Sequence, residues 1–149
     1  MQLTRNPSYG AATAKRPFAL VDRGIGTGLF SGRKLRHRVL ALSLNTRLPV
    51  MGRTRKAIQV LTPAHGRKWL PKARASVYRS EAAITRPTGR DLVRTARTFL
   101  RQPYVWAGRS GFGFDCSGLT GTVYQVHGIT IPRDSGLTAQ IGMAMNGDE

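Results

Sequence analysis

The sequence predicts an α+β protein in two parts, a small β-barrel followed by a helical part that carries the only cysteine. Short apolar runs separated by Gly and Pro turns fill residues 38–80, which is typical of a small barrel. Two stretches with helical periodicity follow residue 88. The single cysteine of the 149-residue chain, Cys116, lies between them after a Gly-rich loop.

Charge divides the chain at about the same place. Its 24 Lys and Arg residues outnumber 7 Asp and Glu residues, which gives a net charge of +17. Residues 1–90 hold 19 of the basic residues but only two acidic ones, whereas residues 91–149 hold five of each sign. The basic half suits a polyanion, either nucleic acid or an anionic cell-wall polymer; the alternative is a solvated Arg-rich surface with no specific partner.

Composition excludes several classes of protein. A hydrophobic content of 40% indicates a folded domain rather than a disordered chain. One cysteine excludes an internal disulfide framework. The sequence has no run of about 18 apolar residues for a membrane span. Nor do the first thirty residues hold the apolar stretch of about 7–15 residues that a signal peptide needs.

Residues 1–36 are predicted to be disordered or unassigned, because four glycines between residues 24 and 32 interrupt any regular element. The barrel is expected over residues 37–82. Its apolar runs lie at 39–44, 48–51, 57–61, 67–70 and 77–78. The segment Trp69-Leu70-Pro71 resembles the end of a bacterial SH3-like domain, although Lys68 stands where that motif has Gly.

Residues 83–90 are predicted to be a linker, and a helix is expected directly after it. Thr88 is a candidate N-cap with Asp91 three residues on, an acidic form of the capping box. Apolar residues recur at helical spacing over 92–100, and Gln102-Pro103 is expected to end the helix.

A second helix is predicted from Cys116 to Gly128. A thiol at a helix N-terminus faces unpaired N–H groups and the positive end of the helix dipole, both of which favour a thiolate. The same N–H groups can hold the oxyanion of a tetrahedral intermediate. Cys116 is therefore a candidate nucleophile for acyl transfer. The flexible loop before it argues against an inert core cysteine.

Several motifs stand in a fixed order across residues 91–142. They are Pro103-Tyr104-Val105-Trp106-Ala107-Gly108, Phe114-Asp115-Cys116-Ser117-Gly118-Leu119, Gly128-Ile129-Thr130-Ile131-Pro132-Arg133-Asp134-Ser135 and Gln140. Together they resemble the first half of an NlpC/p60 cysteine peptidase domain, with Ala107 in place of a Gly and Ile131 in place of a Leu. The resemblance implies a papain-like fold, in which a cysteine-bearing helix packs on an antiparallel sheet that carries the catalytic His. An SH3-like domain ahead of such a domain is a common arrangement in the family.

The resemblance implies hydrolysis of peptide bonds in peptidoglycan stem peptides, typically between D-γ-glutamyl and diaminopimelate, and it implies no metal or other cofactor. Cys116 would be the nucleophile, and Tyr104 would lie beside it to position substrate or oxyanion. Asp115 and Ser117 would bind polar groups of the stem peptide. The alternatives are a core aromatic for Tyr104 and a helix cap for Asp115, alone or in addition to substrate binding.

The resemblance leaves the general base unassigned. The family's His follows the matched region, whereas the histidines here are His37, His65 and His127. His127 is expected at the end of the helix that Cys116 begins, about 16 Å away. We therefore expect residues 91–149 to be the N-terminal half of a catalytic domain, and the chain to be a truncated form with little activity.

The alternative function is a non-catalytic protein that binds the cell wall through its basic SH3-like half. Nucleic-acid binding ranks below both, because the basic region lacks an aromatic stacking platform and any zinc-finger or helix-turn-helix pattern. The expected partners are peptidoglycan or muropeptides, and the resemblance implies the cell envelope, secretion, or the cytoplasm for a muropeptide-recycling enzyme. Arg133 and Asp134 are expected to form a structural pair with each other.

Overall fold

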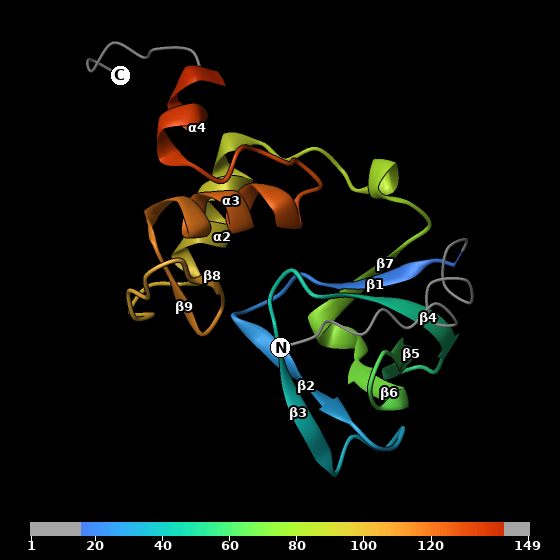
Figure 1. The fold of residues 1–149 in the computed structure, drawn as a ribbon. Coiled ribbons are helices and arrows are strands. Elements are labelled where there is room, and N and C mark those ends of the chain that lie inside the picture. Colours follow the sequence, from blue (N-terminus) through green and yellow to red (C-terminus); the bar gives the residue numbers. More distant parts are fainter. Residues whose placement is uncertain (1–15, 142–149) are drawn as a thin grey trace. The chain divides into compact units, whose positions relative to one another are not determined.

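The computed structural model describes residues 16–141, and the chain divides between Thr85 and Arg86 into two units (Figure 1). We call residues up to Thr85 unit 1 and residues from Arg86 unit 2. The division falls inside the stretch predicted to be a linker, residues 83–90. No helix among the described residues is long and apolar enough to cross a membrane.

Unit 1 is a seven-stranded antiparallel sheet. Its strands are β1 (Phe18–Val21), β2 (Gly26–Phe30), β3 (Arg38–Ser43), β4 (Arg47–Arg53), β5 (Ala57–Thr62), β6 (Gly66–Pro71) and β7 (Ala75–Tyr78). They pair in the order β3-β2-β6-β5-β4-β1-β7. Two single-turn 3₁₀ helices, η1 (Lys72–Arg74) and η2 (Glu81–Ala83), flank β7. The five strands expected between residues 39 and 78 are thus confirmed as β3 to β7.

The core of unit 1 follows from strand alternation. Leu48 and Val50 on β4, and Ile58 and Val60 on β5, are two residues apart and buried, so they lie on one face of the sheet. They join one apolar cluster with buried residues of β1, β2, β6 and β7, namely Ala19, Leu29, Leu70 and Ala75. The β5–β6 hairpin closes at Gly66, whose φ of 62° suits a residue without a side chain.

The structure contradicts the prediction that residues 1–36 are disordered or unassigned. Over residues 16–36, β1 lies between β4 and β7, and β2 lies between β3 and β6. The glycines of β2 permit a close approach of strands rather than breaking one: a Cβ on Gly26 would lie 2.1 Å from the carbonyl oxygen of Leu42 on β3. The part of this prediction that concerns residues 1–15 lies outside the described residues.

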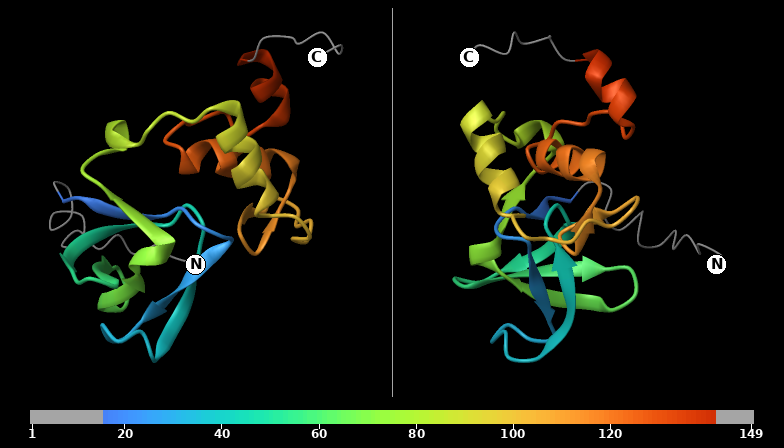
Figure 2. Two further views of the ribbon diagram at one scale, coloured as in Figure 1. Left: turned by 180° about the vertical axis from the view of Figure 1, so that it is seen from behind. Right: turned by 90° about the vertical axis from the view of Figure 1, so that its left-hand side faces the viewer.

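Unit 2 contains three helices and a two-stranded hairpin among its described residues. They are α2 (Gly89–Arg97), β8 (Arg109–Ser110), β9 (Gly113–Phe114), α3 (Cys116–Val126) and α4 (Ser135–Ile141). Helices α2 and α3 lie side by side in every view (Figures 1 and 2). The buried apolar side chains of this unit include Phe99, Phe114, Val123 and Val126. The rings of Phe99 and Phe114 meet edge to face with centroids 4.7 Å apart.

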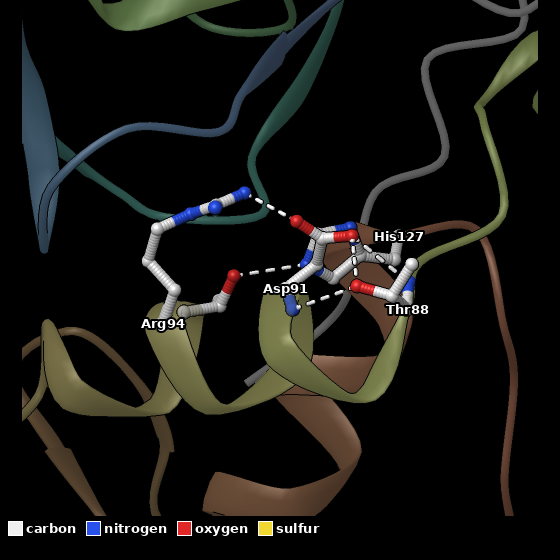
Figure 3. Close-up of polar contacts among 5 residues, drawn as sticks. Thr88, Asp91, Arg94 and His127 are labelled. Carbon is white, nitrogen blue, oxygen red and sulfur yellow. Dashed lines mark hydrogen bonds and ion pairs between the residues drawn. The ribbon is translucent and has the colours of Figure 1, made fainter.

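The N-terminus of α2 is the capping box that the sequence predicts (Figure 3). The Asp91 amide donates to Thr88 Oγ1 at 3.3 Å, and the Thr88 amide donates to Asp91 Oδ2 at 2.9 Å. Arg94 forms an ion pair with the other carboxylate oxygen of Asp91. The helix ends at Arg97, earlier than the expected stop at Gln102-Pro103, and the chain continues through turns.

These contacts predict an acid-sensitive helix start. Hydrogen bonds from Thr88 lower the pKa of Asp91 from 3.8 to about 2, and Arg94 adds to the shift. A carboxylate with a lowered pKa stabilises the fold above its unfolded value, so this contribution is lost as pH falls from about 4 to about 2. We expect Asp91→Asn to flatten the dependence of unit 2 stability on pH in this window, measured by denaturant unfolding and amide exchange in α2. Identical pH profiles for the two proteins would contradict the assignment.

Candidate active site

Cys116 is the first residue of α3, as predicted, and its side chain is exposed. The hairpin of β8 and β9 delivers the chain to this point, with Arg109 paired to Phe114 and Ser110 paired to Gly113. Asp115 follows in extended conformation, with φ of −91° and ψ of 179°, and is the N-cap. A buried hairpin strand thus holds the start of α3 while the thiol stays open to solvent.

Asp115 caps α3, and both of its carboxylate oxygens have polar partners. Its side chain is only 10% exposed, and Oδ1 accepts hydrogen bonds from the Gly118 amide at 2.6 Å and from Ser117 Oγ at 3.4 Å. The Oδ2 atom forms an ion pair with Arg133. The Arg133 hydrogen bond and the Gly118 amide hold the pKa of Asp115 below its usual value, so the carboxylate is charged. The capping role is confirmed; the stem-peptide role stays a prediction.

The sequence predicts that Arg133 pairs with Asp134, but the structure places Arg133 in this site. Its guanidinium donates to both Asp115 Oδ2 and Ser117 Oγ, so one side chain bridges the two predicted substrate-binding residues. Asp115 raises the pKa of Arg133, and the charge of Cys116 contributes in the same direction. Arg133 therefore places a positive charge at the first turn of α3.

The predicted pair of Arg133 with Asp134 is wrong. Asp134 Oδ1 instead accepts from the amides of Gly136 at 2.8 Å and Leu137 at 3.4 Å, at the start of α4. The Asp134 carboxylate caps its own local turn, while the Arg133 guanidinium is engaged by Asp115 and Ser117.

Tyr104 lies beside Phe114, which is two residues before Cys116. The backbone of Tyr104 bridges to Phe114, and the Val105 amide donates to the Phe114 carbonyl at 3.0 Å. The Tyr104 side chain is 66% exposed, so it is not a core aromatic. Trp106 and Phe112 are also exposed. The loop thus presents aromatic side chains on the unit that carries the thiol, and a substrate role for Tyr104 stays a prediction.

Two neighbouring residues fix the turn of this loop. The Gly108 carbonyl accepts from the Asp115 amide at 3.2 Å, and a Cβ on Gly108 would lie 2.7 Å from the carbonyl oxygen of Gly113. Ala107 has a φ of 58°, in the left-handed region that favours glycine. The one departure of this motif from the NlpC/p60 pattern therefore falls where a side chain is costly.

We expect Ala107→Gly to stabilise unit 2 by about 0.5–1 kcal/mol. A residue with a Cβ loses about 1–2 kcal/mol of stability in left-handed backbone. Replacing it with glycine relieves this strain, but the greater conformational entropy of glycine in the unfolded chain offsets about 0.5–1 kcal/mol of the gain. Denaturant unfolding followed by amide exchange in α3 measures the change. Ala96→Gly, in the last turn of α2, is the control and should destabilise the unit by up to about 1 kcal/mol. Equal losses from both substitutions would contradict the strain at Ala107.

His127 lies at the other end of α3 from Cys116. It is the C-cap of the helix, and its Nε2 hydrogen-bonds Thr95 Oγ1 of α2 at 2.9 Å (Figure 3). This confirms the position expected from the sequence and gives the ring a structural contact. His127 is the only histidine in residues 86–141, so the described part of unit 2 places no imidazole beside the thiol. Nor do the described residues gather three or more His, Cys, Asp or Glu side chains that could hold a metal ion.

Each of the two units contains a match to a known protein family. Residues 26–78 match the YKFC SH3b2 domain, and residues 101–149 match the NlpC/P60 family. Along the chain, a match to an SH3b domain is therefore followed by a match to the NlpC/P60 family, and the fold class is the mixed one expected from the sequence.

Its relatives include named peptidases. A gamma-D-glutamyl-L-lysine dipeptidyl-peptidase of Bacillus cereus is 43% identical over 145 residues, which are 97% of this chain and 43% of that protein. A Bacillus subtilis protein of the same name is 44% identical over 62 residues, 42% of this chain and 21% of that protein. The crystal structure of an NlpC/P60 family protein from Bacillus cereus superposes with a TM-score of 0.86 at 42% identity, covering 97% of this chain and 47% of that one. The chain spans less than half the length of these relatives.

Proposed function

We propose that unit 2 supplies the nucleophile of a cysteine peptidase that cleaves γ-D-glutamyl bonds in peptidoglycan stem peptides. The observation that carries this proposal is the exposed Cys116 at the first residue of α3, beside the charged pair of Asp115 and Arg133. The names of the relatives support a γ-D-glutamyl bond with lysine on its amine side. Diaminopimelate at that position is the alternative that family resemblance favours.

In this mechanism the Cys116 thiolate attacks the γ-carbonyl carbon, and the C–N bond then breaks to leave a thioester. Backbone N–H groups at the N-terminus of α3 would hold the oxyanion. The departing amine needs a proton, and thioester hydrolysis needs a base for the attacking water. His127 is held at the far end of α3, so the described residues of unit 2 do not provide that group. We therefore propose that this chain by itself has little peptidase activity.

Asp115 and Ser117 would recognise the free amino terminus of the stem peptide. Asp115 stays ionised because Arg133 and the Gly118 amide stabilise its charge. Arg133 partly neutralises the same carboxylate, so an incoming ammonium group would share Asp115 with the guanidinium. In this scheme Arg133 is a positioning residue, since it fixes both predicted recognition side chains.

An activated ester tests the nucleophile without the need for a general acid. The p-nitrophenyl γ-ester of L-Ala-D-Glu has a leaving group that needs no proton. We expect the 149-residue chain to release one equivalent of nitrophenolate in a burst and to gain the mass of the dipeptidyl group on Cys116. Cys116→Ala should show no burst, and the α-ester of L-Ala-L-Glu should acylate the chain more slowly. Equal nitrophenolate release from the chain and from Cys116→Ala would reject the proposal.

A non-catalytic cell-wall-binding role is the second candidate, favoured by the cationic surface of unit 1. Cosedimentation with purified sacculi separates the two functions. Binding that persists in Cys116→Ala, without release of muropeptides by either protein and without an ester burst, would support the second role.

A further inference from the structure

A cationic groove lies between two loops of unit 1. Its walls are the β2–β3 loop and the β4–β5 turn, and its volume is about 540 Å³. The lining residues are Arg33, Lys34, Leu35, Arg36, Thr54, Arg55 and Lys56. A second hollow of about 330 Å³, lined by residues 31–37, shares the β2–β3 loop with it.

The charge in this groove is uncompensated. Five of the seven lining residues are cations, and none is acidic. The acidic residues described in unit 1, Asp22 and Glu81, pair with Arg23 and Arg47 instead. Within residues 16–141, none of the five groove cations takes part in an ion pair or donates a side-chain hydrogen bond to the protein. Their combined field therefore acts on anions from solution.

Backbone hydrogen bonds hold both walls in place. In the β2–β3 loop, the Leu35 amide donates to the Gly32 carbonyl at 3.0 Å, and the Ser31 amide donates to the His37 carbonyl at 3.0 Å. In the β4–β5 turn, the Thr54 amide donates to the Ala57 carbonyl at 2.8 Å. Because the walls are formed before binding, a ligand does not have to order them, which lowers the cost of association.

The side chains that line the groove limit the class of ligand that it can bind. Guanidinium groups match phosphate oxygens in a two-pronged geometry, and five cations suit a repeating anion better than one phosphate. No lining residue is aromatic, so the groove offers no surface on which nucleobases could stack. We propose that this groove binds a linear, base-free phosphodiester polymer, of the chemistry that poly(glycerol phosphate) represents. The site belongs to unit 1 and does not depend on peptidase activity.

A matched pair of variants tests the groove. Arg36→Gln with Arg55→Gln removes one cation from each wall, and Arg67→Gln with Arg79→Gln removes the same charge from exposed positions outside the lining. Binding of poly(glycerol phosphate) to the full chain is measured at several salt concentrations. We expect the groove variant to bind about tenfold more weakly and to reduce the slope of log K against log salt by about 1.5, at about 0.7–0.9 per lost contact. The control should stay within about twofold.

Three results would overturn the proposal. Equal losses in the groove and control variants would mean that overall charge, not this site, binds the polymer. Tighter binding of oligo(dT) with the same number of phosphates, weakened by the groove variant, would assign the groove to nucleic acid. Absence of polymer binding at low salt would remove the site altogether.

Discussion

Gly118→Ala is expected to destabilise unit 2 by about 2–4 kcal/mol. The added methyl group would clash with the loop packed against α3 and weaken the helix cap. A Cβ at residue 118 would lie 2.0 Å from the carbonyl oxygen of Gly108 and 2.8 Å from Asp115 Oδ1. The first of these neighbours is backbone and cannot turn away. The loop must therefore move off α3, which breaks the bond from the Asp115 amide to the Gly108 carbonyl.

Gly121→Ala is the matched control in the same helix. A Cβ at residue 121 meets nothing within 4 Å. Alanine is the better helix former, so this substitution should stabilise unit 2 by about 0.5–1 kcal/mol. Amide exchange in α3 of the full chain, with denaturant unfolding, measures both changes. The same sign for the two substitutions would show that the contact between Gly108 and Gly118 does not limit stability.

The same contact bears on the thiol. Gly118 lies one helical half-turn after Cys116, and its amide donates to the cap that sets the start of α3. If the proposed nucleophile depends on this start, Gly118→Ala should also slow alkylation of Cys116 by iodoacetamide relative to Gly121→Ala. Glycine in the Asp115-Cys116-Ser117-Gly118 motif is thus explained by close packing of a loop on a helix, which spacing alone does not reveal.

Features that depend on neighbours in sequence could be predicted. The capping box of α2 needs only Thr88 and Asp91, three residues apart, and the structure has it. The start of α3 at Cys116 follows from a polar N-cap residue before a periodic apolar stretch, and it too is confirmed. Such signals are local, since the groups that form them are placed by a single turn of helix.

Contacts that form where the chain folds back on itself could not be predicted in this way. Arg133 reaches Asp115 because the segment after α3 runs back along the helix. The helix from residue 116 to 127 is about 16 Å long, and the seven residues 127–133 can span about 23 Å, so the return is possible. Sequence spacing permits that contact without selecting it over the adjacent Asp134. The pairing of β1 and β2 with strands far along the chain could not be predicted from sequence spacing for the same reason.

Leu29→Ala is expected to destabilise unit 1 by about 2–5 kcal/mol, the range for truncating a fully buried leucine. Leu29 is 0% exposed on β2, lies opposite Leu40 of β3 and belongs to the main apolar cluster. Unfolding can be followed by the fluorescence of Trp69 on β6, because the other tryptophan, Trp106, is 84% exposed and should change little.

Ile25→Ala is the control from the same glycine-rich segment. The Ile25 side chain is 43% exposed, while its carbonyl accepts from the Leu44 amide, a bond that the substitution leaves in place. Its effect should stay within about 0.5–1 kcal/mol. If the segment were only a tail beside a barrel that begins at residue 37, both substitutions would have this small effect. A large loss of stability confined to Leu29→Ala would show that β2 completes the core of unit 1. The loop that carries Arg33 and Arg36 would then be anchored to that core through β2.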